Sequence, residues 1–140
     1  MIRSMAVAFD QSDEAHEALS VAIDLSHRLE IPLIVIHFVG LLEVANKDSS
    51  SDMDAIQEAV AQASRKIGLL VNDLSIELRT LSSSPVEGVV MTVEEENIDL
   101  VVVGSRGHAI DESLLGSTSH QLIEHLGRPV LVVPNRKKAR

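Results

Sequence analysis

Blocks of apolar residues with two different periods alternate along the 140-residue chain. Short, nearly continuous aliphatic runs predict buried strands at Met5–Phe9, Leu33–Val39, Leu100–Val103 and Pro129–Val133. Between Leu74 and Arg79, apolar and polar residues alternate strictly, which predicts a half-buried strand whose polar face suits a sheet edge. The chain is therefore expected to contribute five strands.

The segments between these strands have helical periodicity. A stripe including Ala15, Ala18, Leu19 and Ala22 predicts a first helix, with Ser12 or Asp13 as its cap. A second stripe spans residues 56–71, and a last helix is expected from about Thr118 to Gly127. The polar segment from Gly40 to Ser51 predicts a loop and is the part of the chain that most favours disorder.

The start of the third helix has a distinctive sequence. Ser84 is a suitable cap, Pro85 suits the first helical position and Glu87 lies three residues after the cap. Asn97 is expected to end this helix before the fourth strand.

The resulting βαβαβαβαβ order predicts an α/β fold: a doubly wound, five-stranded parallel sheet with strand order 3-2-1-4-5 and helices on both faces. We expect one domain over residues 1–134, followed by a basic C-terminal tail at 135–140. Asp10, Phe38 and Gly104 each follow or end a strand, so parallel topology brings them to one sheet edge.

Composition limits the class of protein. The chain has two aromatic residues, Phe9 and Phe38, and no cysteine, which indicates an aliphatic core without disulfides or thiol chemistry. No apolar run approaches the roughly 20 residues that span a bilayer, and the apolar stretch within Met1–Asp10 is too short for a signal peptide. We expect a cytoplasmic protein without a membrane partner.

The charge distribution argues against a nucleic-acid partner. The net charge is −9, and four of the 12 basic residues lie at Arg136, Lys137, Lys138 and Arg140. Without these four the balance is 8 basic against 21 acidic residues, or −13, which would repel a phosphate backbone. The tail is interpreted as a solvated terminus, and an RNA-contacting arm is the alternative interpretation.

A glycine segment, residues 103–119, joins the fourth strand to the last helix and has the chemistry of a phosphate site. Gly104 and Gly107 allow a ligand to approach the main chain. Ser117 and Thr118 lie where a new helix presents unpaired N–H groups and its positive dipole end. The pattern predicts a nucleotide ligand.

Over nearly its whole length the chain resembles the universal stress protein family. Phe9-Asp10-Gln11-Ser12 is similar to that family's first-strand motif, and Ile36-His37-Phe38 to its second-strand end. The third helix, the glycine segment and the closing strand Val130–Val133 match as well. The resemblance implies a stress-response role and a homodimer.

In ATP-binding members the glycine motif is G-x2-G-x9-G-[S/T], so the resemblance implies ATP, with or without Mg²⁺, as cofactor. It implies phosphate contacts from Gly104, Gly107, Gly116, Ser117 and Thr118, with Arg106 supplying positive charge. It also implies that adenine lies beside Ala8 and Phe38, that Phe9 belongs to the cofactor-binding residues, and that Asp10 accepts a hydrogen bond from the adenosine portion. Here only eight residues, His108–Leu115, replace the nine, which shortens the reach of the loop by about 3.3–3.6 Å.

Other chemistry finds little support in the sequence. The six histidines show no i, i+4 pair and no neighbouring carboxylate pattern, so no metal site is predicted. Ser105 lacks the nucleophile-elbow motif, the Walker A motif is absent, and no catalytic residue is assigned. His37 is interpreted as a strand-end residue with a satisfied hydrogen bond.

Three classes of function remain. The first is a nucleotide-binding regulatory protein, in which ATP biases a conformation or a partner surface. The second is an enzyme that slowly hydrolyses ATP, for which the sequence positions no general base. The third is a dimeric scaffold without nucleotide. We take the first as the interpretation and the scaffold as its alternative.

The predicted fifth strand also indicates how two copies would associate. In the order 3-2-1-4-5 it lies at a sheet edge, yet Val130–Val133 lacks the charges that normally protect an exposed edge. Antiparallel pairing of two such strands across a two-fold axis would satisfy their free backbone groups. The sequence therefore predicts a homodimer through this strand.

Overall fold

The computed structural model describes residues 1–38, 49–69, 75–81, 84–105 and 117–134. Its five strands form one parallel sheet in the order β3-β2-β1-β4-β5, as the sequence predicts. The strands are β1 (Met5–Phe9), β2 (Leu33–Phe38), β3 (Ile76–Leu81), β4 (Leu100–Gly104) and β5 (Val130–Val133).

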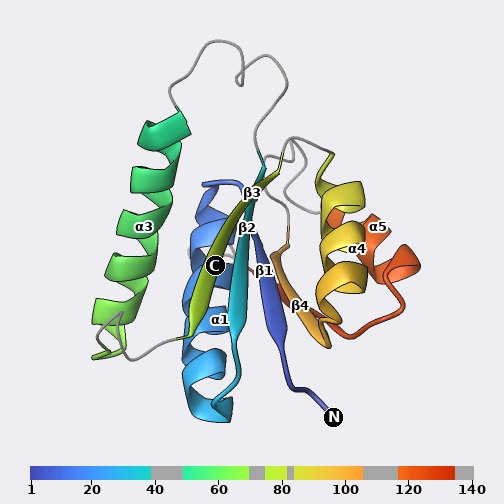
Figure 1. Ribbon diagram of the computed structural model, residues 1–140, viewed down its shortest axis with the longest axis horizontal. Coiled ribbons are helices and arrows are strands. Elements are labelled where there is room, and N and C mark those ends of the chain that lie inside the picture. Colours follow the sequence, from blue (N-terminus) through green and yellow to red (C-terminus); the bar gives the residue numbers. More distant parts are fainter. Residues whose placement is uncertain (39–48, 70–74, 82–83, 106–116, 135–140) are drawn as a thin grey trace.

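Helices cover both faces of the sheet (Figure 1). They are α1 (Asp13–Leu29), α3 (Ser49–Lys66), α4 (Pro85–Glu96) and α5 (Ser117–His125). The helices α1 and α3 pack on one face, and α4 and α5 on the other. Among the described residues, no helix is both long and apolar enough to cross a membrane.

Alternating side chains of the central strands build two aliphatic cores, one on each face. Met5, Val7 and Phe9 of β1 point towards α1 and α3, where Phe9 is 1% exposed. Ala6 of the same strand is buried on the opposite face, under α4 and α5. Strands buried on both faces are typical of parallel sheets, and this explains the continuous aliphatic runs in the sequence.

The ends of two helices follow local sequence rules. The Ser12 hydroxyl accepts a hydrogen bond from the Ala15 N–H at 3.1 Å, so Ser12 is the cap of α1. Ser84 has N-cap backbone geometry before Pro85 but makes no side-chain capping bond. Asn97 ends α4 in the left-handed conformation, with φ at 52°.

Three predicted boundaries are wrong. The second helix, expected to continue to residue 71, ends at Lys66. The loop expected through Ser51 ends earlier, because residues 49–51 already form the first turn of α3; the part at 40–48 lies outside the described residues. The edge strand expected between Leu74 and Arg79 is displaced towards the C-terminus and ends at Leu81. Its pairing with β2 runs from Leu33 opposite Ile76 to Phe38 opposite Leu81, which explains the displacement.

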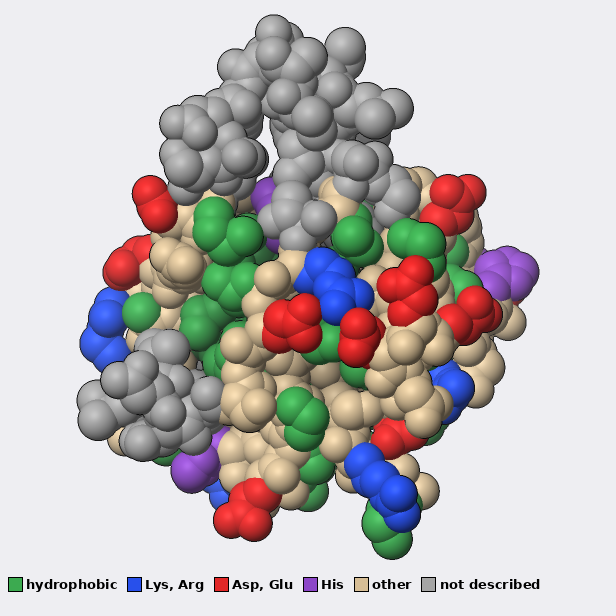
Figure 2. All heavy atoms as spheres, in the orientation of Figure 1, with side chains coloured by type: hydrophobic (Ala, Val, Ile, Leu, Met, Phe, Trp, Pro, Cys, Tyr) green, Lys and Arg blue, Asp and Glu red, His purple; other side chains and the backbone are tan. Residues whose placement is uncertain are grey.

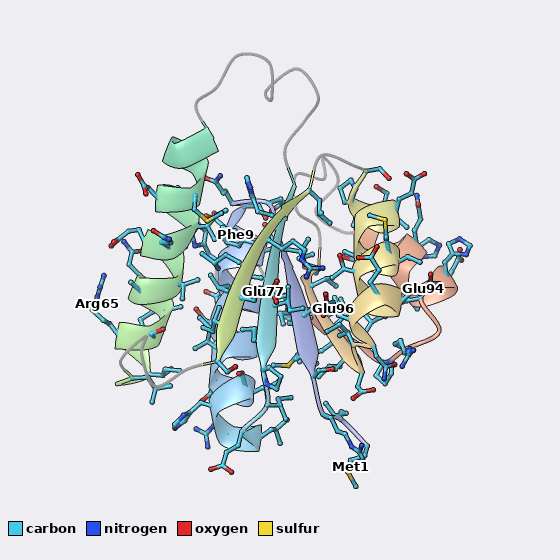
Figure 3. All side chains as sticks on the ribbon, in the orientation of Figure 1. Met1, Phe9, Arg65, Glu77, Glu94 and Glu96 are labelled. Atoms are coloured by element: carbon cyan, nitrogen blue, oxygen red, sulfur yellow. The ribbon has the colours of Figure 1, made fainter. Side chains whose placement is uncertain are left out.

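A charged cluster joins the edge strand β3 to α4. Arg79 donates hydrogen bonds to Glu77 at 3.0 Å and to Glu96 at 2.8 Å. The space-filling view shows a basic side chain flanked by acidic ones on this face (Figure 2), and Glu77 and Glu96 lie near each other in Figure 3. The hydrogen bonds that Arg79 donates to Glu96 and Glu77 raise the pKa of Arg79 above its ordinary value. This edge of the sheet is therefore both charged and tied to a helix.

Candidate functional site at the carboxyl edge of the sheet

All five strands are parallel, so their carboxyl ends share one edge of the sheet, called the carboxyl edge below. There Phe9 lies opposite His37 of β2, Phe38 opposite Leu81 of β3, and Gly104 opposite Val133 of β5. The strand order reverses between β1 and β4, which are neighbours despite their separation in sequence. In open α/β sheets, the crevice at such a reversal is where ligands bind.

Hydrogen bonds tie both ends of the glycine segment to this edge. Ser119, in the first turn of α5, donates from its hydroxyl to the Gly104 carbonyl at 2.6 Å. The Ser105 N–H donates to the Val133 carbonyl at 3.0 Å. The end of β4 and the start of α5 are thus held together, 15 residues apart in sequence. Ser117 and Thr118 begin that helix, Ser117 exposed and Thr118 partly buried.

The structure gives Gly104 a different reason to be glycine from the one expected. A Cβ built at this position would lie 2.8 Å from the Glu14 main-chain carbon and 2.9 Å from its carbonyl oxygen. These distances are shorter than real Cβ contacts. The space beside Gly104 is therefore filled by α1, and the missing side chain allows helix and strand to pack closely.

Asp10 follows β1 and organises the start of α1. Its Oδ1 accepts hydrogen bonds from the Ser12 N–H at 3.0 Å and the Ser12 hydroxyl at 2.5 Å. Ser12 in turn caps the helix, so the carboxylate holds the cap rather than serving as the cap itself. Both of these hydrogen bonds go to Oδ1, and Asp10 is exposed, so the carboxylate also faces solvent at the carboxyl edge.

Between Asp10 and Ser12 lies a residue that the sequence analysis did not single out. Gln11 has φ at 65°, a left-handed conformation that non-glycine residues seldom adopt. Its side-chain nitrogen lies 3.4 Å from Nε2 of His37, which is 5% exposed. The pair links the ends of β1 and β2. No residue type in this segment signals positive φ, so only the structure could identify Gln11.

Of the remaining predicted site residues, some lie at the carboxyl edge and others lie outside the described residues. Ala8 is partly buried and packs towards α4 and α5, whereas the Phe9 ring is in the opposite core, so only the Phe9 backbone reaches the edge. The backbone of Phe38 ends β2 at this edge, but its side chain is outside the described part. Arg106, Gly107, Gly116 and the shortened loop between the two glycines also lie outside the described residues.

Histidines and carboxylates do meet at one place, contrary to the sequence analysis. On α5, His120 Nε2 lies 3.0 Å from Glu124 Oε1, an i, i+4 pair, and His125 Nε2 lies 3.8 Å from Glu124 Oε2. All three side chains are more than half exposed. Within the described ranges, no three His, Asp or Glu side chains are grouped so that they could hold a metal ion.

Comparisons with known proteins agree with this architecture. The model of the universal stress protein family matches residues 1–134. The chain belongs to the universal stress protein family. Its relative YxiE from Bacillus subtilis, a universal stress protein, is 28% identical, with 95% of this chain and 99% of YxiE covered.

Solved universal stress proteins share the fold. UspA from Lactobacillus plantarum superposes with a TM-score of 0.76 at 19% identity, covering 94% of this chain and 97% of the other. A universal stress protein in complex with cAMP gives 0.74 at 24% identity, covering 96% and 98%. The Archaeoglobus fulgidus protein in complex with dAMP gives 0.61 at 21% identity, covering 95% and 98%. The family thus includes members crystallised with adenine nucleotides.

Proposed function

We propose that this universal stress protein binds an adenine nucleotide at the carboxyl edge and acts as an ATP-binding regulatory protein of the stress response. The observation that carries the proposal is the Ser119–Gly104 hydrogen bond, which holds the start of α5 beside the end of β4. A helix N-terminus next to the strand-order reversal presents N–H donors where nucleotide phosphates bind in such sheets. The cAMP and dAMP complexes of related structures support an adenine ligand.

In this proposal different residues contact the phosphates, the adenine and the rest of the adenosine. Gly107, Gly116, Ser117 and Thr118 contact phosphates through their backbone and hydroxyl groups, and Arg106 adds positive charge. Adenine lies towards Ala8 and Phe38. The outward side of the Asp10 carboxylate accepts a hydrogen bond from the adenosine, while its other side keeps Ser12 in place. Mg²⁺, where present, accompanies the triphosphate, and we place the protein in the cytoplasm.

The first test is a substitution in the glycine segment. Gly116→Val puts a β-branched side chain where phosphate must approach, and we expect it to weaken ATP binding at least about tenfold, or roughly 1.4 kcal/mol. Titration calorimetry measures the affinity. Ala55→Val, an equivalent substitution at an exposed position of α3, is the control and should bind as wild type does. Equal affinity in wild type and Gly116→Val would place the phosphates elsewhere.

The alternative function is a dimeric scaffold of the same fold that carries no nucleotide. Mass spectrometry of the acid-released extract of the freshly purified protein separates the two, because a nucleotide-binding protein retains an adenine nucleotide and a scaffold does not. Slow hydrolysis of ATP by the protein is a further alternative, and release of inorganic phosphate from the protein–ATP complex would reveal it. We assign no residue to that step.

We also propose that two copies associate through β5. The two edges of the sheet differ sharply: β3 carries Glu77 and Arg79, whereas β5 is Val-Leu-Val-Val. Leu131 of β5 is a large apolar side chain that is 37% exposed. An uncharged aliphatic edge favours pairing with another strand, and a second copy supplies an identical one.

A further inference from the structure

The turn from β1 into α1 contains a residue with an unusual backbone conformation. Gln11 has φ at 65°, in the left-handed region. Two other described non-glycine residues, Glu30 and Asn97, also have positive φ, but each ends a helix, where the left-handed conformation is common. Gln11 instead precedes a helix. Glycine would adopt this turn without strain, so the glutamine side chain needs a reason of its own.

Hydrogen bonds between its two sequence neighbours enforce this backbone. The Asp10 Oδ1 accepts from the Ser12 N–H at 3.0 Å and from the Ser12 hydroxyl at 2.5 Å, which closes the turn around Gln11. Strained residues that the surrounding structure holds in place cluster at ligand sites. Gln11 follows β1 at the carboxyl edge, where β1 lies between β2 and β4 and the strand order reverses.

The Gln11 side chain joins the ends of two neighbouring strands. Its Nε2 lies 3.4 Å from Nε2 of His37, the residue of β2 that pairs with Phe9 of β1. The two strands lie side by side in Figure 1. His37 is 5% exposed, whereas Gln11 is exposed. A buried ring thus holds an accessible carboxamide at the carboxyl edge.

This contact determines which groups of the carboxamide remain for a ligand. An amide nitrogen carries two N–H donors and no acceptor, so the neutral His37 Nε2 accepts one N–H of Gln11. His37 does not use the amide oxygen Oε1 or the second N–H, which are neighbours on the planar amide. Together these two groups are an adjacent acceptor and donor. In base recognition, glutamine uses this pair to bind the 6-amino group and N7 of adenine.

We propose that Gln11 selects adenine: its Oε1 accepts a hydrogen bond from the 6-amino group, and its second N–H donates to N7. The proposal rests on the nucleotide function proposed above and names the residue that chooses the base. In that function Asp10, which precedes Gln11, contacts the adenosine, and Phe38, which follows His37, lies beside the adenine. Hypoxanthine and guanine carry an oxygen at position 6, so Oε1 would face a second acceptor and this hydrogen bond would be lost.

The test compares ATP with ITP, which carries a 6-oxo group in place of the 6-amino group. Gln11→Met keeps the length of the side chain but removes the carboxamide. Gln11→Gly removes the whole side chain and suits the left-handed backbone, so it adds no strain. Gln62→Met, at an exposed glutamine of α3, is the matched control. Titration calorimetry measures both affinities for all four proteins, and circular dichroism checks that each variant is folded.

We expect wild type to bind ATP at least about tenfold more tightly than ITP, because a bidentate pair between an amide and a base discriminates by this order. In Gln11→Met and Gln11→Gly, the ATP affinity should fall at least about tenfold while the ITP affinity stays close to that of wild type. The ratio of the two affinities then approaches one. Gln62→Met should keep the wild-type ratio.

Three results would overturn the inference and leave the nucleotide function intact. Equal binding of ATP and ITP by wild type shows that the site does not select the base. A preference for ATP that survives both Gln11 substitutions assigns this selection to another residue. An equal loss of ATP and ITP affinity in both variants gives Gln11 a structural role only. A wild-type protein that binds neither nucleotide overturns the nucleotide function and this inference together.

Discussion

At the scale of single residues, the packing of α1 against the end of β4 depends on the absence of a side chain at Gly104. An added methyl group meets main-chain atoms of Glu14, which cannot rotate away as a flexible side chain would. We expect Gly104→Ala to lower the free energy of unfolding by about 1–3 kcal/mol, measured by urea denaturation. The neighbouring Ser105→Ala keeps the backbone bond to Val133 and should change it by less than about 0.5 kcal/mol.

The outcome at Gly104 decides between two roles for this glycine. If Gly104→Ala unfolds like wild type, the close approach to α1 costs nothing and the packing explanation is wrong. The nucleotide affinity of the variant is measured under conditions where nearly all of it is folded. If the variant is destabilised but this affinity equals that of wild type, Gly104 serves the fold alone.

Single residues also show what the sequence could and could not reveal. The sequence drew attention to Asp10, Ser12 and Gly104 because charge, capping chemistry and a missing side chain are visible in a residue type; of the three roles expected, the structure confirms the cap at Ser12. The sequence could not reveal what fills the space beside Gly104, since that depends on a helix 90 positions earlier in the chain. Gln11 was missed for a related reason: its left-handed backbone is imposed by the turn between β1 and α1.

At the scale of elements, the cluster of Arg79, Glu77 and Glu96 holds the edge strand β3 to α4. Arg79→Met keeps much of the apolar stem but removes both ion pairs, and we expect it to lower the free energy of unfolding by about 1 kcal/mol. Arg28→Met removes one exposed i, i+4 pair and should cost about 0.3–0.5 kcal/mol or less. Thermal and urea unfolding measure both variants. If Arg79→Met destabilises the protein no more than Arg28→Met does, the cluster does not hold β3 to α4.

The sign of the Arg79 pKa shift sets how this contribution depends on pH. The two glutamates raise the pKa of Arg79 in the folded protein. A cation with a raised pKa contributes its full stabilisation below its unfolded value and loses it only as pH rises through the higher folded value. The difference between wild type and Arg79→Met should therefore stay constant from neutral to moderately alkaline pH.

Element types were predictable, and element ends less so. The 3.6-residue stripe of α1 and the Ser-Pro start of α4 are local signals, and both helices begin as expected. The position of β3 depends on its pairing with β2, which no local pattern encodes, and the strand is displaced accordingly. The serines at 49–51 favour loops by composition, yet they extend α3.

At the scale of the whole molecule, the proposed dimer depends on the free edge of β5. The valines at 130 and 132 pack against the protein's own α4–α5 core, so Leu131 is the better probe of a partner. We expect Leu131→Lys to convert a dimer into a monomer in light scattering at micromolar concentration. Leu29→Lys, at a leucine that is 49% exposed at the end of α1, is the matched control and should remain dimeric.

Two results would contradict that assembly. A monomeric wild-type protein at the same concentration removes the dimer altogether. A dimer that survives Leu131→Lys keeps the assembly but moves its interface away from β5.

The overall topology could be predicted because alternating strands and helices admit few right-handed arrangements. The ligand could not be settled in the same way. Phosphate contacts depend on backbone geometry in the glycine segment, and residue types report only which geometries are permitted there.

The central position of β1 has a consequence for how the chain is made. It is the first strand to be synthesised, yet one of its two neighbours, β4, begins only at Leu100. At about 5–20 residues per second, the 90 residues between Phe9 and Leu100 take roughly 5 to 20 seconds to translate. Throughout that interval at least one edge of the aliphatic strand β1 is unpaired in the nascent chain. Newly made copies on one messenger are therefore exposed to strand exchange with each other until β4 has been made.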